Sequence, residues 1–242
     1  MAVISRKLKW VFGLITAVLV VAAAYVYFLG TRVLLEQAES LALRRMTVSQ
    51  LDDSGSFRFF YASNRRQADD YNVIEDRFTS ERVTDLSFGT FDTRIQPTLG
   101  LGMLLDASDW FLNEEIRILQ VQELQREAML ERIRAQVQAS PYRSLLIVVH
   151  GFREAFPPAL RKTAFLSHVL DINTPVLVFD WPGDQGSSLR GYRRARDVAR
   201  ESSEEFTRLI KGVVDEVRPE RLWLFANSMG AEVVVNSFHE LH

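Results

Sequence analysis

Leu222-Trp223-Leu224-Phe225-Ala226-Asn227-Ser228-Met229-Gly230, near the C-terminus, is the stretch that decides the fold. It opens with a short apolar run, as expected of a buried parallel strand, and ends where a helical pattern begins. Ala226 and Gly230 flank Ser228 at the spacing of a nucleophile elbow, a sharp turn that presents a serine to a base and a substrate. Alone, the pentapeptide fits an ordinary strand-to-helix turn equally well.

Two further apolar runs end in turn residues. Residues 145–149 precede His150-Gly151-Phe152, and residues 176–179 precede the turn 180–186. Parallel α/β sheets place their ligand sites at such strand ends. In elbow-type hydrolases a loop N–H and the N–H after the nucleophile form the oxyanion hole, so Phe152 and Met229 are the predicted donors.

Two side chains beside these turns are candidate substrate-binding residues. His150 ends its strand, and Trp181 could line an acyl pocket. Each has a structural alternative. A histidine at the end of such a strand more often orients the loop by hydrogen bonding than it acts as a catalytic base. Trp181 fits equally well as a packing residue.

Four motifs in order resemble an uncharacterised bacterial α/β-hydrolase family, often labelled esterase/lipase superfamily. They are Tyr61-Ala62-Ser63-Asn64-Arg65, His150-Gly151-Phe152, Trp181-Pro182-Gly183-Asp184-Gln185-Gly186 and Ala226-Asn227-Ser228-Met229-Gly230. Asn227 replaces the family's usual histidine, and the Trp-Pro turn carries an extra residue. From about Phe57 onward, the resemblance implies a mostly parallel sheet flanked by helices. It also implies a serine hydrolase that acts on an ester-type bond through Ser228.

The same resemblance implies further strands after the elbow, carrying first an acid and then a histidine. Beyond Ser228, only Glu232, His239, Glu240 and His242 titrate. His239 lies roughly 16 Å along the expected helix, at ~1.5 Å per residue, which is too far to serve as the base. We therefore expect a sheet that is incomplete at the C-terminus and little hydrolase activity. A non-catalytic, membrane-tethered module that keeps the fold is the alternative.

The N-terminus carries an almost unbroken apolar stretch, Trp10 to Leu29, preceded by Arg6, Lys7 and Lys9. Its length and charge bias predict one transmembrane helix with a cytoplasmic N-terminus and an exported C-terminal domain. A cleaved signal peptide, with a small-residue site at Ala22-Ala23-Ala24, is the alternative. The predicted organisation is an anchor at 1–30, a juxtamembrane helix and linker at 31–56, and a hydrolase-like domain at 57–242.

Composition limits the chemistry. The chain has no cysteine, which excludes disulfides and thiol catalysis, and its formal net charge is −2. The arginines between Arg190 and Arg200 are interleaved or followed by acidic residues, which favours a solvated helix face over a nucleic-acid patch. No phosphate loop or metal-spaced cluster occurs. The predicted partners are the bilayer and a small or lipid-like ester, with no cofactor, metal or nucleic acid.

The remaining pattern predicts alternating strands and helices around one sheet. Strands are expected at 57–61 and 116–121, and a hairpin at 86–95. Helices are expected at 124–137, from Pro157-Pro158 onward, and along the amphipathic stripe at 206–217. Residues 64–82 and 96–109 are expected to be loops.

Overall fold

The computed structural model describes residues 15–22, 46–51, 55–70, 73–95 and 116–241. The chain divides into two compact units, residues 1–43 with 97–107, and residues 44–96 with 108–242. In the first unit, residues 15–22 are helical. Within the described ranges, no helix is both long and apolar enough to cross a membrane. Most of the predicted span Trp10–Leu29 lies outside those ranges, as do the predicted juxtamembrane helix at 31–45 and the loop at 96–109.

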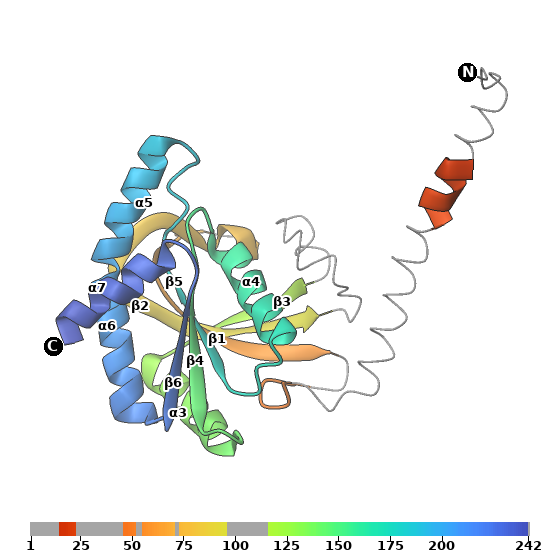
Figure 1. Cartoon of the computed structure of the whole chain (residues 1–242). Coiled ribbons are helices and arrows are strands. Elements are labelled where there is room, and N and C mark those ends of the chain that lie inside the picture. The colour runs from red at the N-terminus through yellow and green to blue at the C-terminus, as the bar shows by residue number, and fades with distance from the viewer. Residues whose placement is uncertain (1–14, 23–45, 52–54, 71–72, 96–115, 242) are drawn as a thin grey trace, which may run out of the picture. The chain divides into compact units, whose positions relative to one another are not determined.

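The second unit is built on a six-stranded sheet (Figure 1). Its strands are β1 (Ser56–Gln67), β2 (Phe78–Ile95), β3 (Ile116–Leu124), β4 (Ser144–Val149), β5 (Val176–Asp180) and β6 (Arg221–Ala226). Their order is β3-β2-β1-β5-β4-β6. The pairs β1–β5, β5–β4 and β4–β6 are parallel, whereas β2 is antiparallel to both β1 and β3. The predicted α/β class with a mostly parallel sheet is confirmed.

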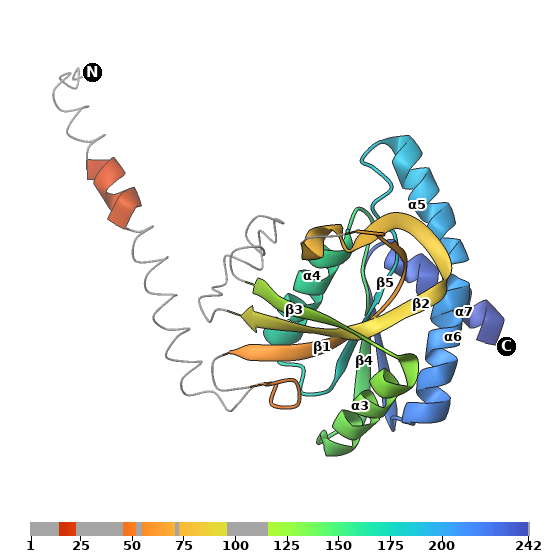
Figure 2. The same cartoon turned by 180° about the vertical axis from the view of Figure 1, so that it is seen from behind.

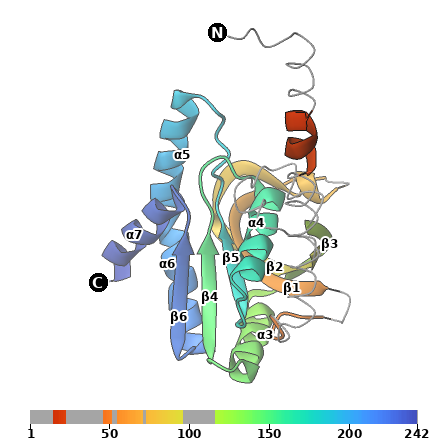
Figure 3. The same ribbon diagram turned by 45° about the vertical axis from the view of Figure 1, so that its right-hand side comes forward.

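One helix follows β3, and helices also follow the parallel strands β4, β5 and β6. They are α3 (Arg126–Ala139), α4 (Phe156–Val169), α5 (Leu189–Glu201), α6 (Ser203–Gly212), which runs into a π-helical turn at Val213–Val217, and α7 (Gly230–Leu241). A short 3-10 helix, Ile74–Asp76, precedes β2. Figures 2 and 3 show α4 on one face of the sheet and α6 with α7 on the other. Sheets whose two faces are covered in this way bury continuous apolar strands.

Burial along the strands follows this layering. Every residue of β4 and β5 is buried. In β4, Leu145, Ile147 and Val149 join the core cluster shared with α3, α6 and α7. β6 is the last strand at one edge of the sheet, and its residues alternate between exposed and partly buried. Leu222 and Leu224 pack against that core, while Trp223 is 56% exposed on the other face.

Two expectations about the N-terminal part of this unit need correction. The expected loop 64–82 is too long at both ends, because β1 continues to Gln67 and β2 begins at Phe78, so only residues 68–77 connect the two strands. The region 86–95 is not a hairpin, because β2 runs unbroken through it. Gly89 allows a close approach rather than a turn: an added Cβ would overlap the Gln122 carbonyl and lie 2.5 Å from the Tyr61 ring. Met46, in the expected linker, is fully buried.

Candidate active site

Ser228 occupies the turn between β6 and α7 in a strained conformation. Its φ of 49° lies in the left-handed region, which residues other than glycine seldom adopt. The Asn227 N–H donates to the Val149 carbonyl at 2.9 Å, tying the turn to the end of β4. The N–H groups of Gly230 and Ala231 donate back to Asn227 and Ser228 at 2.8 and 3.0 Å, which starts α7. The turn therefore holds an exposed serine at the carboxyl end of the sheet.

Two glycines let neighbouring backbone approach this turn. A Cβ on Gly230 would overlap the His150 carbonyl and lie 2.6 Å from that of Val149. A Cβ on Gly151 would lie 3.2 Å from the Asn227 carbonyl oxygen and 3.3 Å from the Ser228 Cβ. The loop that follows β4 is thus packed directly against the serine.

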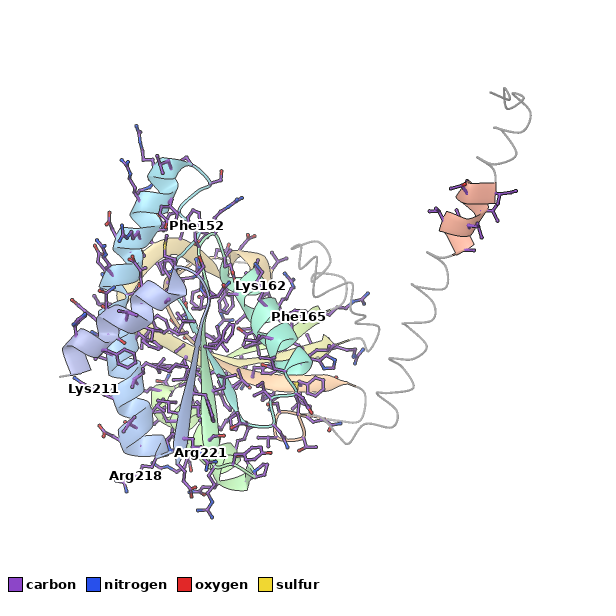
Figure 4. All side chains as sticks on the ribbon, in the orientation of Figure 1. Phe152, Lys162, Phe165, Lys211, Arg218 and Arg221 are labelled. Carbon is purple, nitrogen blue, oxygen red and sulfur yellow. The ribbon has the colours of Figure 1, made fainter. Side chains whose placement is uncertain are left out.

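The two predicted oxyanion donors flank Ser228. Phe152 follows Gly151, which touches the serine, and Met229 follows the serine at the start of α7. Within the described part of the chain, neither N–H has a hydrogen-bond partner. The Phe152 ring meets Tyr192 of α5 edge-on, with centroids 5.3 Å apart, and Figure 4 shows Phe152 near the first turns of α5. Donors at a helix N-terminus, in a favourable field, can stabilise a developing negative charge.

His150 and Trp181 lie behind this loop. They are 3% and 0% exposed, and their rings stack with centroids 5.6 Å apart. The Trp181 indole N–H donates to the His150 carbonyl at 2.8 Å. The His150 Nδ1 lies 3.0 Å from the Gly151 carbonyl oxygen, and Nε2 lies 3.1 Å from an Asp180 oxygen. This placement favours the structural alternative for each residue, loop orientation for His150 and packing for Trp181.

Arg65 is a key residue of the site whose role the sequence motifs did not reveal. Its guanidinium is 1% exposed and lies 2.9 Å from Asp180. It also donates to the Glu154 and Trp181 carbonyls at 2.6 and 2.8 Å, and to Asp184 at 2.6 Å. Strand β1 is thereby joined to the loops that follow β4 and β5. The signal available in the sequence was Arg65 at the end of the motif Tyr61–Arg65, together with two aspartates in the turn 180–186.

Asp180 is the anion at the centre of this network. Burial alone would raise its pKa, but the charge of Arg65 and the hydrogen bond with His150 outweigh burial and lower the pKa below the ordinary 3.8. The Ser63 hydroxyl adds a hydrogen bond of 2.6 Å. Asp180 is therefore ionised at neutral pH and serves as a fixed point for the loops around Ser228.

Comparison with known proteins agrees with this geometry. Residues 125–242 match the family described as alpha/beta hydrolase of unknown function (DUF900). This segment belongs to that α/β-hydrolase family. The matched region holds the loop at 150–152, the turn at 180–186 and the elbow, while β1, β2 and β3 precede it. No curated protein and no solved structure matches the chain.

The described part of the chain lacks a histidine placed to activate Ser228. His150 is buried and turned toward Asp180, and His239 is an exposed residue eleven positions along the chain, in the last turn of α7. Within the same ranges, no cluster of His, Asp or Glu could hold a metal ion. A groove of about 580 Å³ beside Tyr142 and Trp223 lies at the opposite ends of the strands.

Proposed function

We propose that this protein is a serine hydrolase that acts on an ester-type bond. The observation that carries the proposal is Ser228, held at φ 49° with Gly151 packed against its Cβ. A non-glycine residue in that conformation needs its surroundings to hold it, and such strain concentrates at functional sites. Gly151 and Gly230 admit the neighbouring backbone to this turn, as a nucleophile elbow requires.

In the proposed reaction, the Ser228 oxygen attacks the ester carbonyl carbon. The carbonyl oxygen becomes negatively charged, and the N–H groups of Phe152 and Met229 stabilise it. The serine proton passes to a histidine, which returns it to the departing alkoxide. Water then releases the acid from the acyl-serine. We assign that histidine and its acid partner to sequence outside the described residues, as the family resemblance implies.

We further propose that the enzyme is a single-pass membrane protein whose hydrolase domain is exported. The support is the apolar stretch Trp10–Leu29 and the cluster Arg6, Lys7 and Lys9 before it. A membrane anchor would keep the serine near lipid-like esters, which fits the esterase/lipase resemblance.

A non-catalytic binding module on the same fold is the second candidate. The observation that favours it is the lack, in the described residues, of a histidine placed to activate Ser228, since the His150 ring faces Asp180. Such a module would keep the turn for packing reasons alone. Its serine would react no faster than one in an unfolded chain.

A fluorophosphonate probe distinguishes the two. An oxyanion hole and binding, without the triad, still leave roughly 10³–10⁴-fold catalysis over water. The native full chain should therefore label faster than the denatured chain, and Ser228→Ala should abolish labelling. Ser187→Ala, at an exposed serine before α5, is the matched control and should label normally. Labelling no faster than in the denatured chain, or labelling retained in Ser228→Ala, would favour the binding module.

A further inference from the structure

The first half of α5 concentrates positive charge. Arg190, Arg193 and Arg194 are exposed, and no acidic side chain pairs with them within the described ranges. Arg194 donates to the Gln185 carbonyl at 3.2 Å, which is an uncharged partner. Asp197 is the first acidic residue of the helix. Farther along, Arg196 and Arg200 pair with Glu232. The surplus charge is therefore confined to the first turns of α5.

Apolar side chains stand among these arginines. Leu189 is 69% exposed, and Tyr192 is 46% exposed. The opposite side of the helix packs through the buried small residues Gly191, Ala195 and Ala199. We call residues 189–194 the α5 tip. An exposed leucine and tyrosine beside unpaired arginines match the composition of helices that lie at a lipid interface.

The α5 tip adjoins the candidate active site. Tyr192 contacts Phe152, and Phe152 follows the glycine that touches Ser228. In Figures 1 and 3 the N-terminal end of α5 and the loop that leads into it from β5 project beyond the loop that follows β4. A surface that met the α5 tip would therefore lie close to the serine.

We propose that the α5 tip docks on a membrane surface of anionic phospholipid. At about 100° per residue, the outward side of the helix carries four side chains spread over roughly 140° around the helix axis. In angular order they are Leu189, Arg193, Arg190 and Arg194. Diverging arginines suit many headgroups spread over a plane, whereas a single soluble anion needs donors that converge. Each arginine near such a surface contributes roughly fivefold in partitioning, which corresponds to about 1 kcal/mol. This docking does not depend on the chemistry of Ser228.

The lack of native cysteine allows a local test on the full chain. The variant Leu189→Cys carries a polarity-sensitive dye at the α5 tip. The control variant Tyr142→Cys carries the same dye at a residue that is 59% exposed and precedes the start of β4, at the opposite end of this strand from the loop at 150–152. Vesicles of phosphatidylcholine, with and without phosphatidylglycerol, are then added. We expect a blue shift of the dye at position 189 only with the anionic vesicles, and no shift of the dye at position 142. The local dye separates docking from any insertion of the N-terminal stretch.

Charge removal supplies the second readout. Arg190→Gln, Arg193→Gln and Arg194→Gln together should weaken vesicle binding, as the dye at position 189 reports it, about 100-fold, from roughly fivefold per arginine. Raising salt from about 0.1 to 1 M should also weaken it, because the Debye length falls from ~10 to ~3 Å. The matched triple variant at the exposed Arg94, Arg117 and Arg132 should bind normally.

Several results would overturn the docking proposal. They are no shift of the dye at position 189, equal shifts with neutral vesicles or at position 142, and equal losses in both triple variants. A shift with inorganic phosphate or a short RNA in place of vesicles would also overturn it. None of these readouts uses hydrolase activity, so their failure leaves the proposed function standing.

Discussion

Arg65 and Arg66 are neighbours in sequence and opposites in environment. Arg65 is 1% exposed and pairs with the fully buried Asp180, whereas Arg66 and its partner Glu81 are 62% and 64% exposed. Removing one partner of a buried pair leaves an uncompensated charge, which costs about 3–5 kcal/mol, and an exposed pair contributes about 0–1 kcal/mol. Arg65→Met should lower the free energy of unfolding by an amount in the first range, and Arg66→Met in the second. Equal losses in urea denaturation would refute this assignment.

Asp180 should give the protein a stability component that depends on pH. Its pKa is lowered in the folded state, so the ionised carboxylate stabilises the fold above the ordinary pKa of 3.8. That contribution is lost as the pH falls through the lower folded-state value. The stability difference between the wild type and Asp180→Asn should be largest near neutral pH and shrink below about pH 4. Urea midpoints across this range measure it, and a constant difference would contradict the expected pKa.

For single residues, the sequence predicted those features that depend only on neighbouring residues in the chain. The spacing around Ser228 was sufficient to predict its turn, because small flanking residues are what a tight strand-to-helix turn requires. The role of Arg65 could not be predicted. It depends on carbonyl groups of Glu154 and Trp181, which only the assembled sheet brings to β1.

The same contrast holds for secondary structure elements. β4 and β5 were recognisable because both of their faces are covered, which requires continuous apolar runs. The end of β1 was missed because its polar residues are buried and paired across the fold. Asn64, for example, donates to Glu205 at 3.0 Å. The long β2 was missed because Gly89 looks like a turn residue when its cross-sheet neighbours are unknown.

β6 lies at one edge of the sheet, and every second residue of the strand is exposed. Trp223 and Phe225 are 56% and 39% exposed, and an apolar edge strand invites pairing between molecules. Trp223→Lys with Phe225→Lys should reduce aggregation, measured by light scattering, at a cost below about 1 kcal/mol. Leu224→Ala, on the packed face, should cost about 2 kcal/mol, near the low end for partly buried leucines. If the two lysine substitutions left aggregation unchanged, the exposed face of β6 would not be the surface through which molecules associate.

At the scale of the whole molecule, the charges around the N-terminal apolar stretch predict its orientation. Arg6, Lys7 and Lys9 should stay cytoplasmic, and a reporter fused after Arg45 should be exported. The side of the membrane is measured with two reporters, one that is active only after export and one that is active only in the cytoplasm. Replacing the three basic residues by glutamate is the control and should reduce export of the fusion. Activity confined to the cytoplasmic reporter would rule out the proposed topology.

Ser228, Phe152 and Met229 form one reacting unit in the proposed mechanism. The most direct measurement is a crystal structure of the full chain after reaction with a fluorophosphonate. We predict one adduct, on the Ser228 oxygen, whose phosphonyl oxygen accepts hydrogen bonds from both N–H groups at about 3 Å. Well-ordered Phe152 and Met229 nitrogens more than about 8 Å apart could not share one oxygen. That separation, or an adduct on another serine, would contradict the account.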